Sequence, residues 1–233
     1  ELSKLYLDEN NISLGNEWNV LSKYSVGKID SPDRYIWTEQ GSEVYEKLIG
    51  TYLDNSMWNV RYVKFEGDVN EKTEEYAVYI NHDGTLNQIR HKLPENKEGV
   101  RLNEKSARET VLQFLVEKYQ LNKDDVKEIS AEPANLPNRD DWTFIYSDLK
   151  THEMNEGDLR IKIELGGNQI VSTNRYVHLP EEWEREEKNN RTTLGLFRTV
   201  SYFTLVFFII YAAAASIAGW SKGSFNLNIF NIS

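Results

Sequence analysis

The stretch from Trp58 to Glu95 reads WNVRYVKFEGDVNEKTEEYAVYINHDGTLNQIRHKLPE, and a stretch with the same order of features runs from Asp141 to Glu181. Each begins with a predicted strand that has tryptophan near its start and alternates apolar and polar residues, followed by an acidic loop. A second strand, a glycine-containing turn and a third strand then lead to the sequence LPE. Such alternation and such turns are typical of β-hairpins, and proline ends a strand because it has no N–H for the ladder. We predict two three-stranded antiparallel meanders related by duplication, with coincidence between two ordinary hairpins as the alternative.

An amphipathic helix is expected before each meander. The segment NEKSARETVLQFLVEKYQ has Asn103 as a candidate N-cap, and SEVYEKLIGTYLDN begins at Ser42. The positions on one helical face are Ala107, Val111, Phe114, Leu115 and Lys118 in the first segment and Val44, Leu48 and Tyr52 in the second. One such helix covers one face of a sheet, so the sequence predicts an α+β fold of two repeated units, each with one helix and one meander. ELSKLYLDENNISLG predicts a further short helix, and a strand is expected near Leu21 to Val26.

A single transmembrane helix is predicted after the two units. Residues 194–220 read LGLFRTVSYFTLVFFIIYAAAASIAGW, in which Arg198 is the only charged residue. A run of this length crosses roughly 30 Å of hydrocarbon as a helix, whereas a buried core helix is shorter and carries a polar face. Trp183 and Trp220 lie on either side of the run, and we predict that they and Arg198 lie at the membrane interfaces.

The predicted organisation has five parts. Residues 1–100 form the first α+β unit with its N-terminal helix, 101–182 the second unit, 183–193 a juxtamembrane helical collar, 194–220 the transmembrane helix and 221–233 a polar tail. The chain begins with Glu1 rather than methionine and stops in this tail, so we interpret it as a piece of a larger membrane protein.

Composition excludes several classes of function. The net charge of -10 argues against a nucleic-acid surface, because no basic stripe is available for phosphates. Without cysteine the chain has no disulfide, thiol nucleophile or iron–sulfur cluster, and this absence leaves the compartment open. The expected partners are the lipid bilayer and a peptide or protein substrate.

No catalytic, cofactor-binding or metal-binding residue is assigned from the sequence. The histidines form no HExxH or other i, i+4 pair, and GxSxG, Walker and GxGxxG motifs are absent. Adjacent carboxylates are frequent, but neighbouring residues on a strand point to opposite faces and make no acid/base pair. A surface or strand-face role is expected for His82, His91, His152 and His178.

Several segments together resemble one protein family. These are WNVRYVKF, EEYAVYINHDGTLNQIRHKLPE, the helix near SARETVLQFL, and YVHLPEEWEREE leading into the membrane helix, with WSKGSF after it. The arrangement is similar to the N-terminal, PepSY-like extension of bacterial CPBP proteins, the CAAX-protease or abortive-infection family of intramembrane metalloproteases. The resemblance implies a divalent metal, zinc, in the parent protein, held by an EExxxR motif and by histidine motifs on later membrane helices.

The segment EEKNNR matches the EExxxR spacing with Glu186, Glu187 and Arg191. It precedes the predicted span, however, and no histidine follows Glu187, so a metal bound there would lack its other ligands. We interpret EEKNNR as part of the collar.

Three functions are compared. The first is a non-catalytic regulatory or substrate-recognition domain of a CAAX-type protease, and the alternative is a tethered peptide-binding or inhibitory module of a membrane protein without protease activity. A self-contained enzyme is disfavoured because no convergent site is visible.

The orientation in the membrane is judged from the basic residues on either side of the predicted span. Four of them lie at its N-terminal side, Arg185, Lys188, Arg191 and Arg198, against Lys222 at the other side. The positive-inside rule would therefore place the soluble part in the cytoplasm, but that rule weakens for large translocated domains. The resemblance implies an extracytoplasmic domain on the cell membrane.

Overall fold

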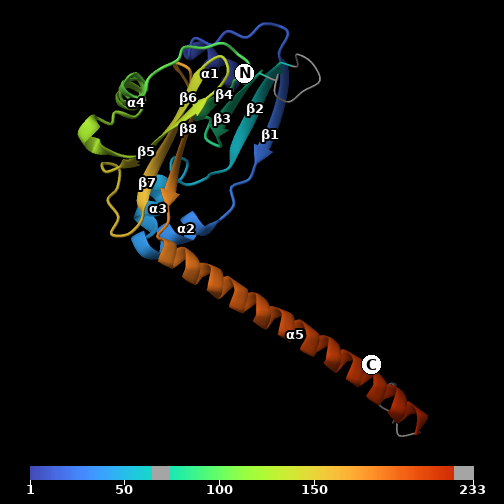
Figure 1. Cartoon of the computed structure of the whole chain (residues 1–233). Coiled ribbons are helices and arrows are strands. Elements are labelled where there is room, and N and C mark those ends of the chain that lie inside the picture. Colours follow the sequence, from blue (N-terminus) through green and yellow to red (C-terminus); the bar gives the residue numbers. More distant parts are fainter. Residues whose placement is uncertain (65–73, 223–233) are drawn as a thin grey trace. The chain divides into compact units, whose positions relative to one another are not determined.

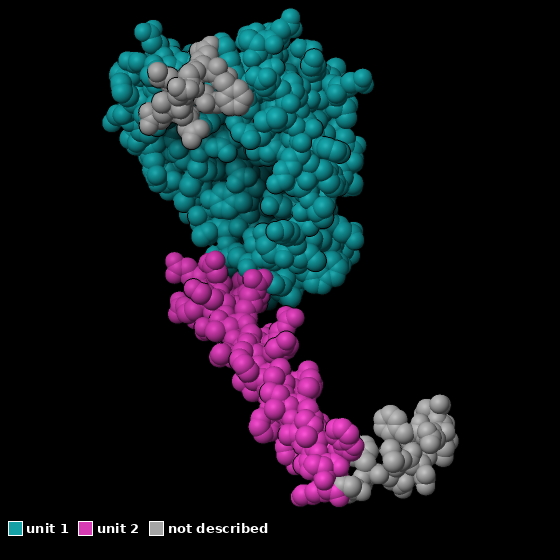
Figure 2. All heavy atoms as spheres, turned by 90° about the vertical axis from the view of Figure 1, so that its right-hand side faces the viewer, with its two compact units in different colours: residues 1–180 teal, residues 181–233 magenta. Residues whose placement is uncertain are grey.

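The computed structural model describes residues 1–64 and 74–222. The chain divides into two compact units, residues 1–180 and residues 181–233 (Figure 2). The acidic loop predicted in the first repeat and nearly all of the predicted polar tail lie outside the described residues. The first unit is α+β, and the second consists, in its described part, of one long apolar helix.

The first unit contains two four-stranded antiparallel sheets in which consecutive strands pair (Figure 1). The N-terminal sheet is formed by β1 (Asn19–Ser25), β2 (Met57–Lys64), β3 (Glu74–Asn81) and β4 (Leu86–Lys92). The C-terminal sheet is formed by β5 (Val126–Asn135), β6 (Asp140–Asp148), β7 (Asp158–Gly166) and β8 (Gln169–His178). Gly84 and Gly167 adopt positive φ angles of 88° and 64° in the predicted hairpin turns. Glycine adopts such angles without a steric clash because it has no Cβ.

The predicted three-stranded meanders are wrong in strand number, because each sheet has a fourth strand at its edge. In the N-terminal sheet this strand is β1, close to the strand expected near Leu21, and it pairs with β2. In the C-terminal sheet it is β5, which the sequence did not suggest. A bulge at Ile129 interrupts the alternation of β5, and Pro133 is tolerated because β5 is an edge strand.

The helices of the first unit are α1 (Leu2–Glu9), α2 (Ser31–Tyr35), α3 (Ser42–Leu48) and α4 (Glu104–Tyr119), with a π-helix at Ile36–Gln40 and a 3-10 helix at Lys123–Asp125. The N-cap prediction for α4 is confirmed, because the Asn103 side chain accepts a 2.9 Å hydrogen bond from the Ser106 N–H. The helix beginning at Ser42 is shorter than predicted. It ends at Leu48, since Gly50 takes a positive φ of 77° in the following turn, and Tyr52 therefore lies beyond the helix.

The helices lie at different positions along the chain in the two halves of the first unit, which departs from the predicted repeat. Helix α4 precedes all four strands of the C-terminal sheet, whereas α2 and α3 lie between β1 and β2. The two halves of the unit therefore share the order of their strands but differ in the placement of their helices. A PepSY-like relationship remains a proposal.

Each sheet has its own core. In the C-terminal half, Val111 and Leu115 of α4 and Phe144, Ile161 and Ile163 of the sheet are fully buried. In the N-terminal half, Leu7 of α1 belongs to a buried cluster with Tyr62, Val78 and Ile80. Complete burial of an aliphatic side chain stabilises a fold by about 1.5–3 kcal/mol, so these contacts fix which helix covers which sheet.

The two sheets lie side by side at β4 and β8, and no β-ladder joins these strands in the described part of the chain (Figure 1). Side chains connect the two halves instead. The buried guanidinium of Arg139 donates to the carbonyl oxygens of Pro94 and Lys97 at 2.6 and 2.9 Å, and to the carboxylate of Asp141 at 2.8 and 3.1 Å.

The second unit is dominated by α5 (Glu181–Ser221), a continuous helix of 41 residues. The segment expected to form the collar and the apolar run both lie in this helix. Its first turn contains Glu181, Glu182 and Glu184, which interact favourably with the N-terminal end of the helix dipole.

Candidate functional site

Helix α5 is the one helix among residues 1–64 and 74–222 that is long and apolar enough to cross a membrane, which supports membrane association. Trp183 lies in its N-terminal part, Arg198 and Trp220 are exposed along it, and Trp220 keeps 77% of its surface. Since these residues follow one another along one helix, they do not converge into a site. Their positions at the membrane interfaces remain predictions.

The EEKNNR segment forms an ordinary turn of helical surface. Arg191 Nε donates a 3.1 Å hydrogen bond to Glu187 Oε1, one turn earlier on α5. No group of three or more His, Asp or Glu side chains in the described part of the chain is arranged to hold a metal ion. The zinc implied for a parent protein remains a proposal.

Neighbouring carboxylates have separate partners, as their positions on strands require. Glu74 accepts from His91 Nε2 at 2.7 Å and from Lys97 Nζ at 2.5 Å, whereas Glu75 accepts both guanidinium bonds of Arg61 at 2.6 Å. Burial lowers the pKa of His91 and Glu74 opposes this effect, so this cluster is a structural ion-pair network at the ends of β3 and β4.

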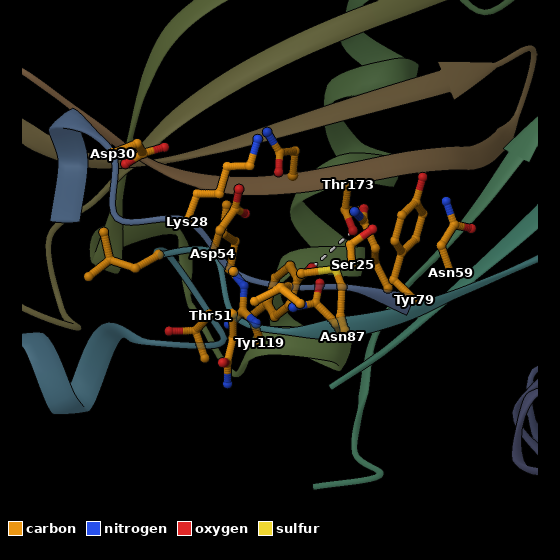
Figure 3. Close-up of a pocket in the computed structure, with 18 residues that line it drawn as sticks. Ser25, Lys28, Asp30, Thr51, Asp54, Asn59, Tyr79, Asn87, Tyr119 and Thr173 are labelled. Carbon is orange, nitrogen blue, oxygen red and sulfur yellow. Dashed lines mark hydrogen bonds between the residues drawn. The ribbon is translucent and has the colours of Figure 1, made fainter. Parts of the chain in front are cut away.

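The strongest candidate site is a cavity of about 460 Å³, hereafter the junction cavity, which lies where the N-terminal sheet and β8 come together (Figure 3). Its volume is within the range of about 300–1,000 Å³ that is typical of small-ligand sites. The lining residues that carry the argument are Lys28, Asp54, Asn59, Asn87, Tyr119 and Arg175. A second cavity of about 270 Å³ shares Asn87, Gln88, Tyr119 and Thr173 with it, so polar side chains extend along the junction.

Arg175 on β8 is held by aromatic rings. Its guanidinium carbon lies over the rings of Tyr119 and Tyr52, at 4.9 and 5.5 Å from their centroids. Attraction between a cation and a ring face contributes about 0.5–2 kcal/mol and orients the planar group. Tyr119 is held in turn, because its hydroxyl donates to Thr173 Oγ1 at 3.1 Å. The guanidinium is therefore oriented without the help of a carboxylate.

Neither Arg175 nor Lys28 forms an ion pair with a carboxylate of the described residues. The buried Asp148 lies against Tyr52, yet its oxygens are occupied. They accept from the Tyr52 hydroxyl at 2.5 Å, from the Lys150 and Thr151 N–H groups at 2.9 Å each, and from the Thr151 hydroxyl. Burial raises the pKa of Tyr52, so its hydroxyl remains a neutral donor.

The wall of the cavity opposite Lys28 in Figure 3 is formed by Tyr79 and Asn59, which face each other across β2 and β3. The buried Asn59 Oδ1 has no hydrogen-bond partner among the described residues. A β-bulge places Asn87 as an extra residue in β4, where its side-chain N–H₂ donates to the Gly50 carbonyl at 3.0 Å. Bulges redirect side chains, and this bulge adds an amide to the cavity wall.

Acidic groups also line the junction cavity. Burial, followed by the hydrogen bond with Asp33, raises the pKa of Asp30 to about 6, so its negative charge decreases as the pH falls through that value. Asp54 is exposed. The cavity therefore presents two cations, two acids and several amides, which suits a polar ligand with donors and acceptors of its own.

Comparison of the chain with known protein families, with curated proteins and with solved structures finds no match. The geometry of the junction cavity therefore carries the functional argument.

Sequence reasoning did not find the cavity residues. The segment NRYVHLPE, which contains Arg175, is predicted from the sequence only as the end of the third strand of a meander. The available signal was the juxtaposition of Asn174, Arg175 and Tyr176 in a strand of a strongly acidic protein. Their partners come from distant segments, so the sequence could not show the cavity itself.

Proposed function

We propose that residues 1–180 form a membrane-tethered recognition domain that binds a peptide or protein segment and does no chemistry of its own. The observation that carries the proposal is the junction cavity, which combines an oriented guanidinium, a second cation, several amide side chains and aromatic rings. A peptide offers a matching set of N–H donors, carbonyl acceptors and charged ends.

The tether is α5, which is long and apolar enough to cross a membrane. A domain attached to a bilayer encounters membrane-associated partners at a raised effective concentration, so a modest intrinsic affinity is sufficient for recognition. This suits a regulatory or substrate-recognition role better than that of a freely diffusing enzyme.

The test is a binding assay on the full chain in detergent micelles, with a pool of randomised, fluorescein-labelled tripeptides and fluorescence anisotropy as the measurement. Asn174→Trp places a large ring in the cavity from an exposed position on β8, and Asn16→Trp makes the same change in an exposed turn outside it. We expect binding by the wild type and by Asn16→Trp, and its loss in Asn174→Trp. Absence of binding, or equal binding by both variants, would exclude peptide recognition in this cavity.

The finer form of the proposal assigns the domain to a CAAX-type intramembrane metalloprotease, as a regulatory or substrate-recognition domain outside the membrane. It is supported by the resemblance of the WNVRYVKF, HKLPE and YVHLPEEWEREE segments to that family. The alternative is a tethered peptide-binding or inhibitory module of a membrane protein without protease activity. The coding sequence beyond Ser233 separates them. Further spans that contain EExxxR and histidines support the protease, and their absence supports the alternative.

A further inference from the structure

We infer that the junction cavity recognises a carboxylate, with Arg175 as the binding residue and Lys28 as the second cation. The inference rests on the proposed function, because it names the chemical group by which a peptide would be held. A free C-terminus and an Asp or Glu side chain are the two sources of that group.

The first argument is the state of Arg175. A guanidinium withdrawn partly from water is usually satisfied by a carboxylate, and this chain has 37 acidic residues against 27 basic ones. Arg175 nevertheless forms no ion pair in the described structure and is held instead between the rings of Tyr119 and Tyr52. A planar fork of donors that is oriented but unpaired matches the two oxygens of a carboxylate.

The second argument is that the acid bound to Tyr52 already has partners of its own. Asp148 accepts four hydrogen bonds from the Tyr52 and Thr151 hydroxyls and from two backbone amides. These bonds fix its carboxylate at the C-terminal end of β6. Asp148 therefore positions Tyr52, which supports the guanidinium, and leaves the guanidinium donors to another anion.

The third argument concerns the amide N–H that lies next to a peptide carboxylate. The residue that carries a C-terminal carboxylate also has an amide N–H. The cavity is lined by the amide side chains of Asn87, Gln88 and Asn174, whose oxygens are acceptors for such a group. Lys28, from the segment after β1, adds a second positive charge to the same cavity.

The experiment compares three tripeptide pools on the full chain in detergent micelles. All are labelled at the N-terminus with a dye that has no carboxylate, and every residue except the final Asp of the third pool is neutral. The first pool has a free C-terminal carboxylate, the second is amidated, and the third is amidated but ends in Asp. Hydrogen bonds to charged groups contribute about 1.5–3 kcal/mol, which corresponds to roughly 10- to 150-fold in Kd. We expect the second pool to bind at least about tenfold more weakly than the first, and the third pool shows whether a side-chain carboxylate substitutes for the C-terminus.

Arg175→Gln should abolish the difference between the free-acid and amidated pools, and Arg175→Lys should retain part of it. Arg90→Gln removes the same charge from β4 outside the cavity and should leave the difference unchanged. The comparison of pools on the wild type needs no variant, so a folding defect at Arg175 does not affect it. Equal binding of all three pools that Asn174→Trp abolishes would overturn the carboxylate inference and leave the proposed function standing. No binding of any pool would overturn both.

Discussion

Replacement of Arg139 by leucine should strongly destabilise residues 1–180, because the arginine is a buried charge with several hydrogen-bond partners. The Arg139 side chain is 3% exposed and donates to Asp141 and to the carbonyl oxygens of Pro94 and Lys97, which lie in the segment joining the two sheets. Arg139→Leu leaves these acceptors without their donor while keeping an apolar group in place of the first part of the arginine side chain.

The magnitude follows from the partners that are left behind. Removal of one partner of a buried ion pair costs about 3–5 kcal/mol. Asp141 is 24% exposed and retains a 3.0 Å hydrogen bond from the Gly167 N–H, so the lower end of this range, about 3 kcal/mol, is expected. For a domain of this size, 1 kcal/mol corresponds to about 2–4 °C in Tm, which predicts a fall of about 6–12 °C.

The assay is thermal unfolding of the full chain in detergent micelles, followed by tryptophan fluorescence. The matched control is Arg101→Leu. Arg101 pairs with Asp140 at 2.5 Å and donates to the carbonyl oxygens of Leu136 and Pro137, but its side chain is 51% exposed, so its loss should cost about 1 kcal/mol or less. An equal fall in Tm for both variants would refute the reasoning, because burial would then not distinguish the two arginines.

Three further predictions concern other parts of the chain. Leu115→Ala, at a fully buried position of α4, should lower the free energy of unfolding by about 2–5 kcal/mol in the same assay, and Val116→Ala, which is 45% exposed, by much less. The hydrogen bond from Arg108 holds the pKa of Glu128 below its usual 4.5, so its stabilisation is present above that pH and is lost as the pH falls through the lowered value. Urea unfolding at several pH values should therefore show a shallower loss of stability below pH 4.5 in Glu128→Gln than in the wild type. Ile209→Arg places a charge in the apolar part of α5 at a cost of about 2.5–3.5 kcal/mol, and should reduce retention in alkaline-washed membranes, whereas unchanged retention would contradict a membrane-spanning α5.

The elements that were predicted well from the sequence depend on local chemistry. Helix α4 was predicted because Asn103 caps it and its apolar residues recur at helical spacing, and both hairpin turns were visible as glycine pairs or Asp-Gly. Strand β5 was missed because the bulge at Ile129 breaks its alternation and Pro133 is compatible only with an edge strand.

The junction cavity was not predictable because it depends on contacts between distant segments. Arg175 is oriented by Tyr52 and Tyr119, and the unpartnered acceptor Asn59 comes from β2. Patterns of period two or 3.6 identify strands and helices but contain no information on which strands of two separate sheets adjoin. Membrane association, by contrast, was readable from one continuous apolar segment.

The absence of a ladder between β4 and β8 has a consequence for motion within residues 1–180. Strands within one sheet cannot slide without breaking several main-chain hydrogen bonds together, whereas the two sheets can shift against each other by rearranging side chains alone. The width of the junction cavity is set by this relative position. A molecule bound to both Asn87 of β4 and Arg175 of β8 would restrain this movement. Binding in the cavity would therefore change the rigidity of the whole unit.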